Sequence, residues 1–415
     1  TAARTAMGAG GGRTIRFRAG TYAAGASYTL ASVAYASRVT LTGESGAKLT
    51  GTFKLANPSN VTVAGLDLHC TDAAINGYVL SLEGACTNCI VTLNKIHAFH
   101  YDPFTDFTLG GYDNPDGIGS INSGGWNNGC NITQNEVYDV MDAIVIQMAG
   151  AADYDINDNE LYWYYDDAMK VEVHPGAKDA NKRFLRNFAR DAIGRRALDA
   201  QDPHIDFIQF VSGADIHDIE VTGVVIKQNV CYNTSSARGW AHQGICSFND
   251  GGFRCIITDA VISGNFLQVD GSWPFTMRMN RGIISHNTFI KGPEADGVTK
   301  ADGRCAPEIS ITGTGPTFLR NVWEDTAVVT GATLTDNLVI GDKGATNSYA
   351  STFDGATFVP ASFANVKTMW SRKSGGPADV GFGRGAIGTG IGAFGSPRDP
   401  SGWTYNAAYE QVTPS

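Results

Sequence analysis

Three segments in the middle of the chain share one alternating pattern of apolar and polar positions. They cover residues 142–147, 167–172 and 206–210, and each opens with an aspartate. In the first, Ile144 and Ile146 alternate with Val145 and Gln147. Alternation with a period of two indicates a strand with one buried and one outward face. We therefore expect three similar strands stacked on one another.

A second pattern, apolar-x-x-Asn-x-apolar, recurs along most of the chain. Its asparagines are Asn94, Asn135, Asn159, Asn187, Asn229, Asn265, Asn287, Asn321 and Asn337. Intervals of roughly 20 to 40 residues are typical of a solenoid. Asparagine tolerates the left-handed conformation of a tight corner, and its amide can bond to the next asparagine one rung along. The repeat predicts an all-β, right-handed parallel β-helix. A β-sandwich, the competing all-β fold, gives no reason for one recurrent asparagine.

Setting the strands in register after each asparagine predicts two columns of side chains. The outward column reads Val145, Lys170, Gln209, Cys246, Arg278 and Ser310, and the neighbouring one reads Asp142, Asp167, Asp206 and Gln243. Just before these strands lie Tyr165, Asp166, His204 and His242. By parity the aspartates fall with the inward set, so we expect them to reach water at the corner that precedes each strand. A register error of one residue would move every side chain to the other face.

The two ends of the chain differ from its middle. Residues 2–22 are expected to form a short helix and a Gly-rich strand that cap the first rung, because an open sheet edge invites pairing with other chains. Residues 368–415 are Gly-rich and end the repeat. We expect one β-helix domain over residues 1–367, and a tail over 368–415 that packs on it or is partly disordered.

Composition narrows the class of protein. Glycine accounts for 50 of 415 residues, where an average chain of this length holds about 30. The formal net charge of -10 argues against a general nucleic-acid binder. No apolar run of membrane-spanning length occurs in the sequence, so no membrane partner is expected. We expect a secreted or extracellular protein, a phage-borne one included.

Eight cysteines leave disulfides and buried thiols as alternatives. The single CxxC, Cys86 to Cys89, lacks the second ligand pair of a structural zinc site. Most of the cysteines are therefore expected to face the core as small hydrophobic residues.

Two local runs add candidate binding groups. Residues 178–196 form a cationic segment in an otherwise acidic chain; it includes Arg195 and Arg196. It could be a solvated loop or a clamp for an anionic polymer, since arginine binds carboxylates in a bidentate manner. Residues 162–165 are all aromatic. We expect two of them to fill the core and two to stack on sugar rings.

Two reactions fit the central residues. Stacked carboxylates about 5 Å apart cannot all ionise freely, so one should have a raised pKa and act as an acid in glycoside hydrolysis. The candidates are Asp142, Asp166, Asp167 and Asp206. In β-elimination, Lys170 would instead remove a proton from an anionic sugar, with Arg278, Arg195 or His204 as stabiliser. Neighbouring cations would lower the pKa of that lysine.

The N-terminal turn, the Asn-cornered rungs and the Asp-rich strands, over residues 1–340, resemble the right-handed β-helix superfamily of polysaccharide lyases, polygalacturonase-type hydrolases and phage tailspikes. The resemblance implies Lys170 and Arg278 as base and acid of a lyase, and calcium as neutraliser of a uronate. Asp142 followed by Asp166-Asp167 is similar to two motifs of the polygalacturonase group, whose Gly-His-Gly and Arg-Ile-Lys motifs are absent. Asp202-Pro-His204 is similar to a piece of mannuronan C5-epimerases. All three resemblances imply a carbohydrate polymer as substrate.

These observations favour an enzyme that cleaves an acidic polysaccharide by β-elimination. The alternatives are an inverting glycoside hydrolase, a uronate C5-epimerase, and a non-catalytic tailspike-like or adhesin rod, monomeric or trimeric. The expected catalytic residues are Lys170, His204, Asp206, Asp167 and Arg278. The expected substrate-binding residues are Asp142, Asp166, Tyr165, Arg195, Arg196, Gln209, His242 and Gln243. Clustered carboxylates also suit Ca²⁺, although no metal ligands are assigned.

Overall fold

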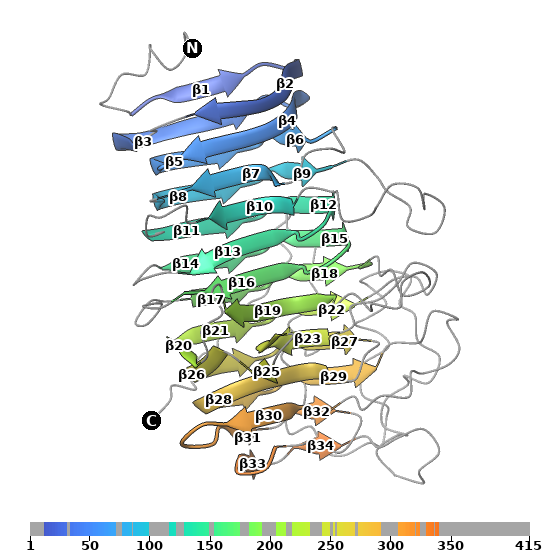
Figure 1. Cartoon of the computed structure of the whole chain (residues 1–415). Helices are drawn as coiled ribbons and strands as arrows, with labels where there is room; N and C mark the ends of the chain where they lie inside the picture. Colours follow the sequence, from blue (N-terminus) through green and yellow to red (C-terminus); the bar gives the residue numbers. More distant parts are fainter. Residues whose placement is uncertain are drawn as a thin grey trace.

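The computed structural model shows a coil of short strands stacked along one axis (Figure 1). It describes residues 12–30, 34–71, 77–84, 86–98, 116–121, 128–148, 153–174, 182–192, 205–212, 218–232, 243–249, 252–253, 255–269, 273–291, 306–319, 321–323, 329–335 and 337–339. Within these residues 32 strands are connected by backbone hydrogen bonds, and every pairing among them is parallel. The parallel β-helix expected from the sequence is confirmed.

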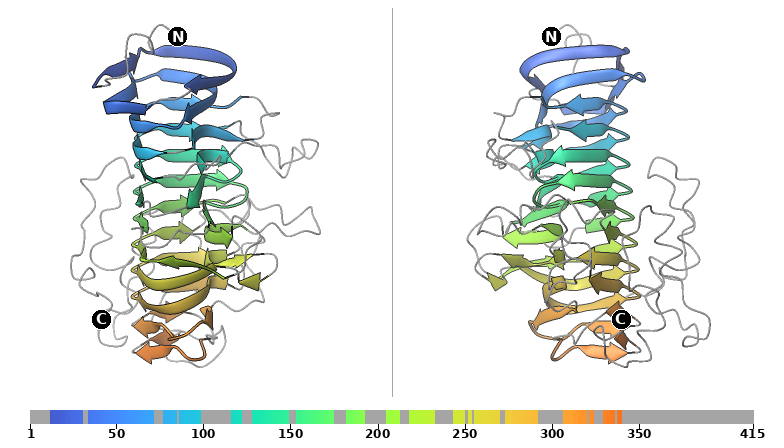
Figure 2. Two further views of the ribbon diagram at one scale, coloured as in Figure 1. Left: turned by 60° about the vertical axis from the view of Figure 1, so that its left-hand side comes forward. Right: turned by 90° about the vertical axis from the view of Figure 1, so that its right-hand side faces the viewer.

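Three strands make a rung, and equivalent strands of successive rungs form three sheets (Figure 2). Sheet I contains β7 (Tyr78–Glu83), β10 (Asp116–Ile121), β13 (Ile144–Met148), β16 (Met169–Val173), β19 (Asp206–Ser212), β23 (Gln243–Cys246), the first half of β28 (Trp273–Ser285) and β30 (Glu308–Ile311). Sheet II contains β1 (Thr14–Phe17), β3 (Ala34–Gly43), β5 (Ser59–Ala64), β8 (Thr87–Thr92), β11 (Asn128–Thr133), β14 (Tyr154–Asn157), β17 (Lys182–Leu185), β21 (Val224–Lys227), β26 (Cys255–Ser263), the second half of β28, β31 (Thr317–Leu319) and β33 (Thr333–Thr335). Sheet III contains β6 (Asp67–His69), β9 (Lys95–His97), β12 (Glu136–Val140), β15 (Glu160–Tyr164), β18 (Phe188–Arg190), β22 (Val230–Tyr232), β27 (Phe266–Val269), β29 (Thr288–Lys291), β32 (Val322–Trp323) and β34 (Leu338–Val339).

The remaining strands depart from the regular three-strand rung. Strand β2 (Gly20–Leu30) pairs with β4 (Ala47–Ala56), which runs from sheet III into sheet I. Strand β20 (Ile219–Thr222) pairs with the start of β26, and β24 (Phe248–Asn249) forms an antiparallel hairpin with β25 (Gly252–Phe253). The described part of the chain contains no helix, so none there is long and apolar enough to cross a membrane. The expected helical cap is not supported, because its first residues, 1–11, lie outside the described part. The expected tail, 368–415, also lies outside it.

The core is built from columns of inward side chains. One column in sheet I runs from Leu80 through Ile118, Ile144, Met169, Ile208 and Ile245 to Phe275, and none of these residues exposes any surface. Parallel rungs place like residues above one another, so each apolar position is covered by the next rung. The inward alternation expected for the three central strands is therefore confirmed. The seven described cysteines are buried, as expected for small core residues.

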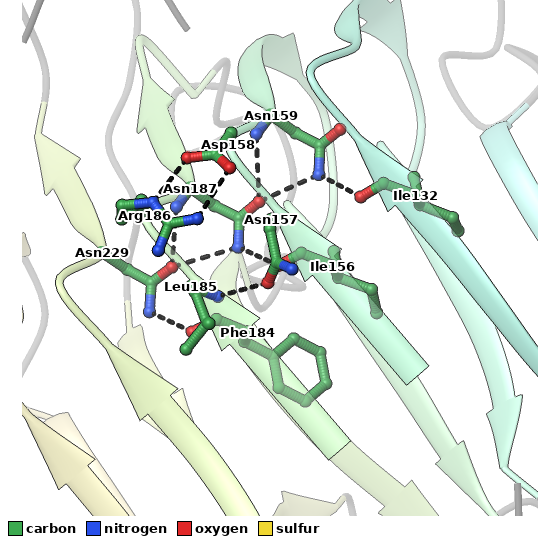
Figure 3. A network of polar contacts seen from close by, with 10 residues as sticks. All are labelled: Ile132, Ile156, Asn157, Asp158, Asn159, Phe184, Leu185, Arg186, Asn187 and Asn229. Atoms are coloured by element: carbon green, nitrogen blue, oxygen red, sulfur yellow. Dashed lines mark hydrogen bonds and ion pairs between the residues drawn. The ribbon is translucent and has the colours of Figure 1, made fainter. Parts of the chain in front are cut away.

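An unbroken asparagine ladder fixes the corner between sheets II and III. Each of the eight repeat asparagines from Asn94 to Asn321 donates a side-chain amide bond to the asparagine of the next rung, and Asn337 ends the series. The Nδ2 of Asn187 donates to Ile156 O at 2.7 Å and to Asn229 Oδ1 at 3.1 Å (Figure 3). Its Oδ1 accepts from the backbone and side-chain nitrogens of Asn159. The amides thus pair buried backbone groups that the corner removes from the sheets.

The left-handed residue of this corner is not the asparagine itself. In the described rungs it is the preceding residue, such as Leu93, Gln134, Asp158 or Arg186, with φ between 54° and 59°. The expectation that asparagine supplies this conformation is wrong. The asparagine instead satisfies the backbone next to the bend, and residues of several types accept the positive φ there.

The cationic segment also differs from its expected role. Arg183 pairs with Asp155, Arg186 with Asp158 at 2.7 Å, and Arg190 with Glu160 at 3.0 Å. These arginines belong to β17 and β18 or the corner between them, and the parallel register places a carboxylate one rung back from each. The described part of the segment is therefore a strand and corner with neutralised charges, and not an inserted clamp. Arg195 and Arg196 lie outside the described residues.

Candidate active site

The central aspartates lie at the corner where sheet III passes into sheet I. Asp142 lies between β12 and β13, Asp166 and Asp167 lie between β15 and β16, and Asp206 opens β19. The register Ile144–Met169–Ile208 places Asp142, Asp167 and Asp206 in one column, and Asp206 pairs with Gln243 as expected. The column predicted from the sequence is confirmed.

This column forms a ladder of carboxylates that resembles the asparagine ladder. Asp142 N donates to Asp116 Oδ1 at 3.1 Å, Asp167 N to Asp142 Oδ1 at 2.8 Å, and Asp206 N to Asp167 Oδ1 at 3.0 Å. The Sγ of Cys246 donates to Asp206 Oδ2 at 3.1 Å. The carboxylates of Asp116, Asp142 and Asp167 therefore each accept a bond from the backbone of the following rung. Most of the column thus has a structural use that the sequence pattern did not indicate.

Lys170 lies between one carboxylate of the ladder, Asp142, and the neighbouring carboxyl group of Asp166. Its Nζ lies 3.4 Å from Asp142 Oδ2 and 3.7 Å from Asp166 Oδ2. One oxygen from each of Asp142, Asp166 and Asp167 lies within 4.8 Å of the others. We refer to Asp142, Asp166, Asp167 and Lys170 as the carboxylate–lysine cluster. The side chains of Lys170 and Asp166 expose 26% and 23% of their surface, so the cluster is open to solvent at these two residues.

Burial and crowding favour protonated carboxyl groups in this cluster. Burial, followed by the negative charge of Asp142, raises the pKa of Asp166 to about 7, although Lys170 acts in the opposite direction. Burial and the charges of Asp166, Asp206 and Asp142 raise the pKa of Asp167 well above its usual range. The pKa of Asp116 is raised by burial and by Asp142. The raised carboxyl pKa expected from a stacked column is therefore present.

The expected effect on Lys170 has the opposite sign. Burial opposes its charge, but the carboxylates of Asp142, Asp167, Asp166 and Asp116 outweigh burial and raise the pKa of Lys170. The sequence interpretation assumed neighbouring cations and hence a lowered pKa. Acidic neighbours surround the ammonium in the structure, so Lys170 is a protonated counter-ion at neutral pH.

Several expected site residues have little access to solvent. Asp167 and Asp206 are 1% and 0% exposed, so their expected access to water at the corner is wrong. Gln243 is 1% exposed, and Tyr165, Gln209 and Asp142 are buried to more than nine-tenths. Gln209 does lie beside Lys170 in register. The aspartates are buried because the ladder directs their carboxylates toward the next rung.

Arg278 does not belong to the Lys170 column. Cys246 pairs with Thr276, and Arg278 lies two residues further along β28, where it pairs with Ser310. Its guanidinium donates to Thr312 Oγ1 at 3.1 Å and pairs with Asp218. Strand β28 lies three rungs beyond β16, which corresponds to about 14 Å along the axis. Arg278 is thus absent from the carboxylate–lysine cluster. A shift of two residues keeps the outward face, so alternation could not reveal the error.

Two further residues belong to this neighbourhood. Asp116 precedes the ladder aspartates by one rung and has the same Asp-x-apolar pattern, which could have revealed it. Tyr78 pairs with Asp116 in register, and its ring lies against Gly119, where a methyl group would come within 2.3 Å of ring carbon Cδ1. Burial and the charges of Asp116, Glu172 and Asp142 raise the pKa of Tyr78. No repeat pattern marks this tyrosine.

The remaining expected site residues, His204 and His242, lie outside the described part of the chain. Their roles stay predictions.

Comparisons with known proteins add the following. The sequence matches no family model, and no curated protein is similar to it in sequence. Among solved structures, the chain is similar to a mannuronic acid specific polysaccharide family 6 lyase enzyme from human gut microbiota, with a TM-score of 0.38 and 11% sequence identity. The similarity covers 82% of this chain and 80% of that chain. Beyond the parallel β-helix fold, membership of the expected superfamily stays a prediction.

Proposed function

We propose that the protein is an enzyme that cleaves glycosidic bonds of a polysaccharide by hydrolysis at the carboxylate–lysine cluster. The observation that supports hydrolysis is a solvent-accessible carboxyl group with a pKa of about 7, Asp166, beside the lysine-paired carboxylate of Asp142. Glycoside hydrolysis needs one protonated and one ionised carboxyl group that flank the same bond. Elimination needs a base, and the raised pKa of Lys170 disfavours that role.

In this proposal Asp166 donates its proton to the glycosidic oxygen as the bond to the anomeric carbon breaks. Asp142 then assists the attack of water, or attacks the anomeric carbon itself before water releases the sugar. Lys170 holds Asp142 in its ion pair and orients it toward the bond. The oxygens of the cluster lie within 4.8 Å of one another, closer than the ~6.5–9.5 Å typical of inverting enzymes. The expected inverting geometry is therefore not favoured.

Calcium fits the cluster poorly. Three carboxylates supply oxygen ligands of the kind that Ca²⁺ prefers, at ~2.3–2.6 Å. The Lys170 ammonium, however, already lies 3.4 Å and 3.7 Å from two of these oxygens. A divalent ion bound to them would lie close to this cation and be repelled by it. We expect that dialysis against a chelator leaves both turnover and the melting temperature unchanged. A loss of turnover that added Ca²⁺ restores would contradict this assignment.

The nature of the products tests the reaction type. Incubation with a panel of neutral and uronate-containing polysaccharides should release reducing ends from at least one polymer without the ultraviolet absorbance of unsaturated uronates. Absorbance that grows in step with reducing ends would establish elimination and contradict hydrolysis. If the polymers bind but none is cut, the protein would be a carbohydrate-binding rod without catalytic activity. Lys170→Met separates the two reactions further, because it should reduce hydrolysis by weakening the position of Asp142 and should abolish elimination outright.

A further inference from the structure

One aromatic residue next to the carboxylate–lysine cluster has a conformation that its own backbone does not favour. Trp163 has φ = 54°, in the left-handed region that bulky side chains rarely adopt. The registers of Tyr138 with Tyr162 and of Tyr162 with Arg190 align Trp163 with Asp139 and Asp191 on the neighbouring rungs. These two aspartates have φ values of 53° and 52°. The corner thus requires positive φ on three successive rungs, and aspartate is a residue type that tolerates it.

Packing in the core does not explain the tryptophan. Of the aromatic run, Tyr162, Tyr164 and Tyr165 are 7%, 0% and 7% exposed, whereas Trp163 is only half-buried. The run was expected to divide into two core residues and two that stack on sugars. Of these four residues, Trp163 alone is not buried, and part of its side chain reaches solvent.

Two stacked tyrosines support the indole. The rings of Tyr138 and Tyr162 are parallel within 7°, with centroids 4.7 Å apart. The indole of Trp163 stands at 83° to the first and 76° to the second, at 6.1 Å and 5.0 Å. The indole plane therefore runs along the stacking direction, parallel to the coil. Arg190 covers the outer face of Tyr162 at 4.1 Å and is held there by its ion pairs with Glu160 and Asp191.

Trp163 precedes Asp166 by three residues, so their Cα atoms are at most about 11 Å apart, roughly the length of two sugar units. We propose that Trp163 is a sugar-stacking subsite, which binds the apolar face of a pyranose ring next to the bond positioned at Asp166. This inference rests on the proposed function, because the indole is inferred to bind the same polymer that the carboxylate–lysine cluster cleaves. Its ligand is a pyranose ring of the polymer, held by its C–H face.

Trp163→Asn tests the subsite, because asparagine tolerates the positive φ without adding a third carboxylate beside Asp139 and Asp191. We expect KM for the cleaved polymer to rise roughly tenfold, kcat at saturation to stay within about threefold, and the melting temperature not to fall. Trp163→Phe should retain most of the affinity. Trp323→Asn is the matched structural control, since Trp323 is 2% exposed and packs on Phe318; it should lower the melting temperature.

A Trp163→Asn protein that melts far below wild type with unchanged KM would make this tryptophan structural and overturn the subsite. A fall in kcat at unchanged KM would overturn it as well. Calorimetry measures binding of the intact polymer without turnover, so it distinguishes failure of the proposed function from failure of the subsite. If Asp166→Asn retains full turnover while Trp163→Asn still weakens binding, the assignment of hydrolysis to Asp166 fails and the subsite stands. If wild type and Trp163→Asn bind the polymer equally, the subsite fails whatever the reaction.

Discussion

Asp166→Asn should reduce turnover by roughly 10²–10⁴-fold while the protein remains folded. Asparagine keeps the shape of Asp166 but cannot donate a proton to the glycosidic oxygen. Initial rates with the polymer identified by the product panel measure the effect. Asp155→Asn is the matched control, because Asp155 is an ion-paired aspartate of β14 in sheet II. It should keep turnover near the wild-type value, and equal losses in both variants would contradict a special role for Asp166.

The pH dependence of kcat and of stability provides a second test of Asp166. Asp166 must be protonated to act as an acid, so wild-type kcat should fall as the pH rises through about 7, the pKa of this carboxyl. The folded protein also binds a proton more tightly here than the unfolded chain, whose carboxyl titrates near 3.8. This group therefore lowers stability as the pH rises between about 4 and 7. Asp166→Asn should remove that decline and melt no lower than wild type at pH 8.

Asn187→Ala should destabilise the protein by roughly 2–5 kcal/mol. The change removes the donor to Ile156 O and to Asn229 Oδ1, and the acceptor of two bonds from Asn159. All of these groups are buried in the ladder, where an unpaired polar atom costs about 1–3 kcal/mol. Urea unfolding followed by circular dichroism measures the effect, and hydrogen exchange should locate it in the rungs of Asn159 and Asn229.

Asn187→Asp separates lost hydrogen bonds from a lost side-chain volume. Aspartate keeps the size and the acceptor but not the donor, and it adds a charge in a buried site, so it should cost at least as much as alanine. Asn131→Ala provides the reference, since Asn131 is an exposed residue of β11. It should change the free energy of unfolding by no more than about 0.5 kcal/mol. A tolerated Asn187→Asp would show that the amide donor contributes little.

Local pattern was sufficient for the architecture of the described residues. The repeated asparagine specified the corner between sheets II and III, and period-two alternation specified which residues face the core. Because rungs of a parallel coil stack at one spacing, these two patterns also specified that Asp142, Asp167 and Asp206 share a column. Such inferences succeed when one face of a strand is buried, since a shift of one residue would then expose the core.

The chemistry of the corner depended on contacts that no linear pattern contains. The sequence placed Arg278 in the Lys170 column, but a register shift of two leaves alternation unchanged and moves the guanidinium away. It gave Lys170 cationic neighbours, whereas its ammonium lies between the carboxyl groups of Asp142 and Asp166 in the structure. Tyr78 reaches the site only because Gly119 on the next rung leaves room for its ring.

The sequence by itself determined the coil, its corners and the column of aspartates, because these follow from the period-two alternation and from one asparagine that recurs on each rung. Only the tertiary structure decided which carboxyls meet water and what charge Lys170 carries. Exposure and pKa depend on the sum of burial and charge from several rungs, and residues distant in sequence contribute to that sum. For this reason the ladder buries Asp167 and Asp206, while Asp166, one position before the column, lies at the surface beside Lys170.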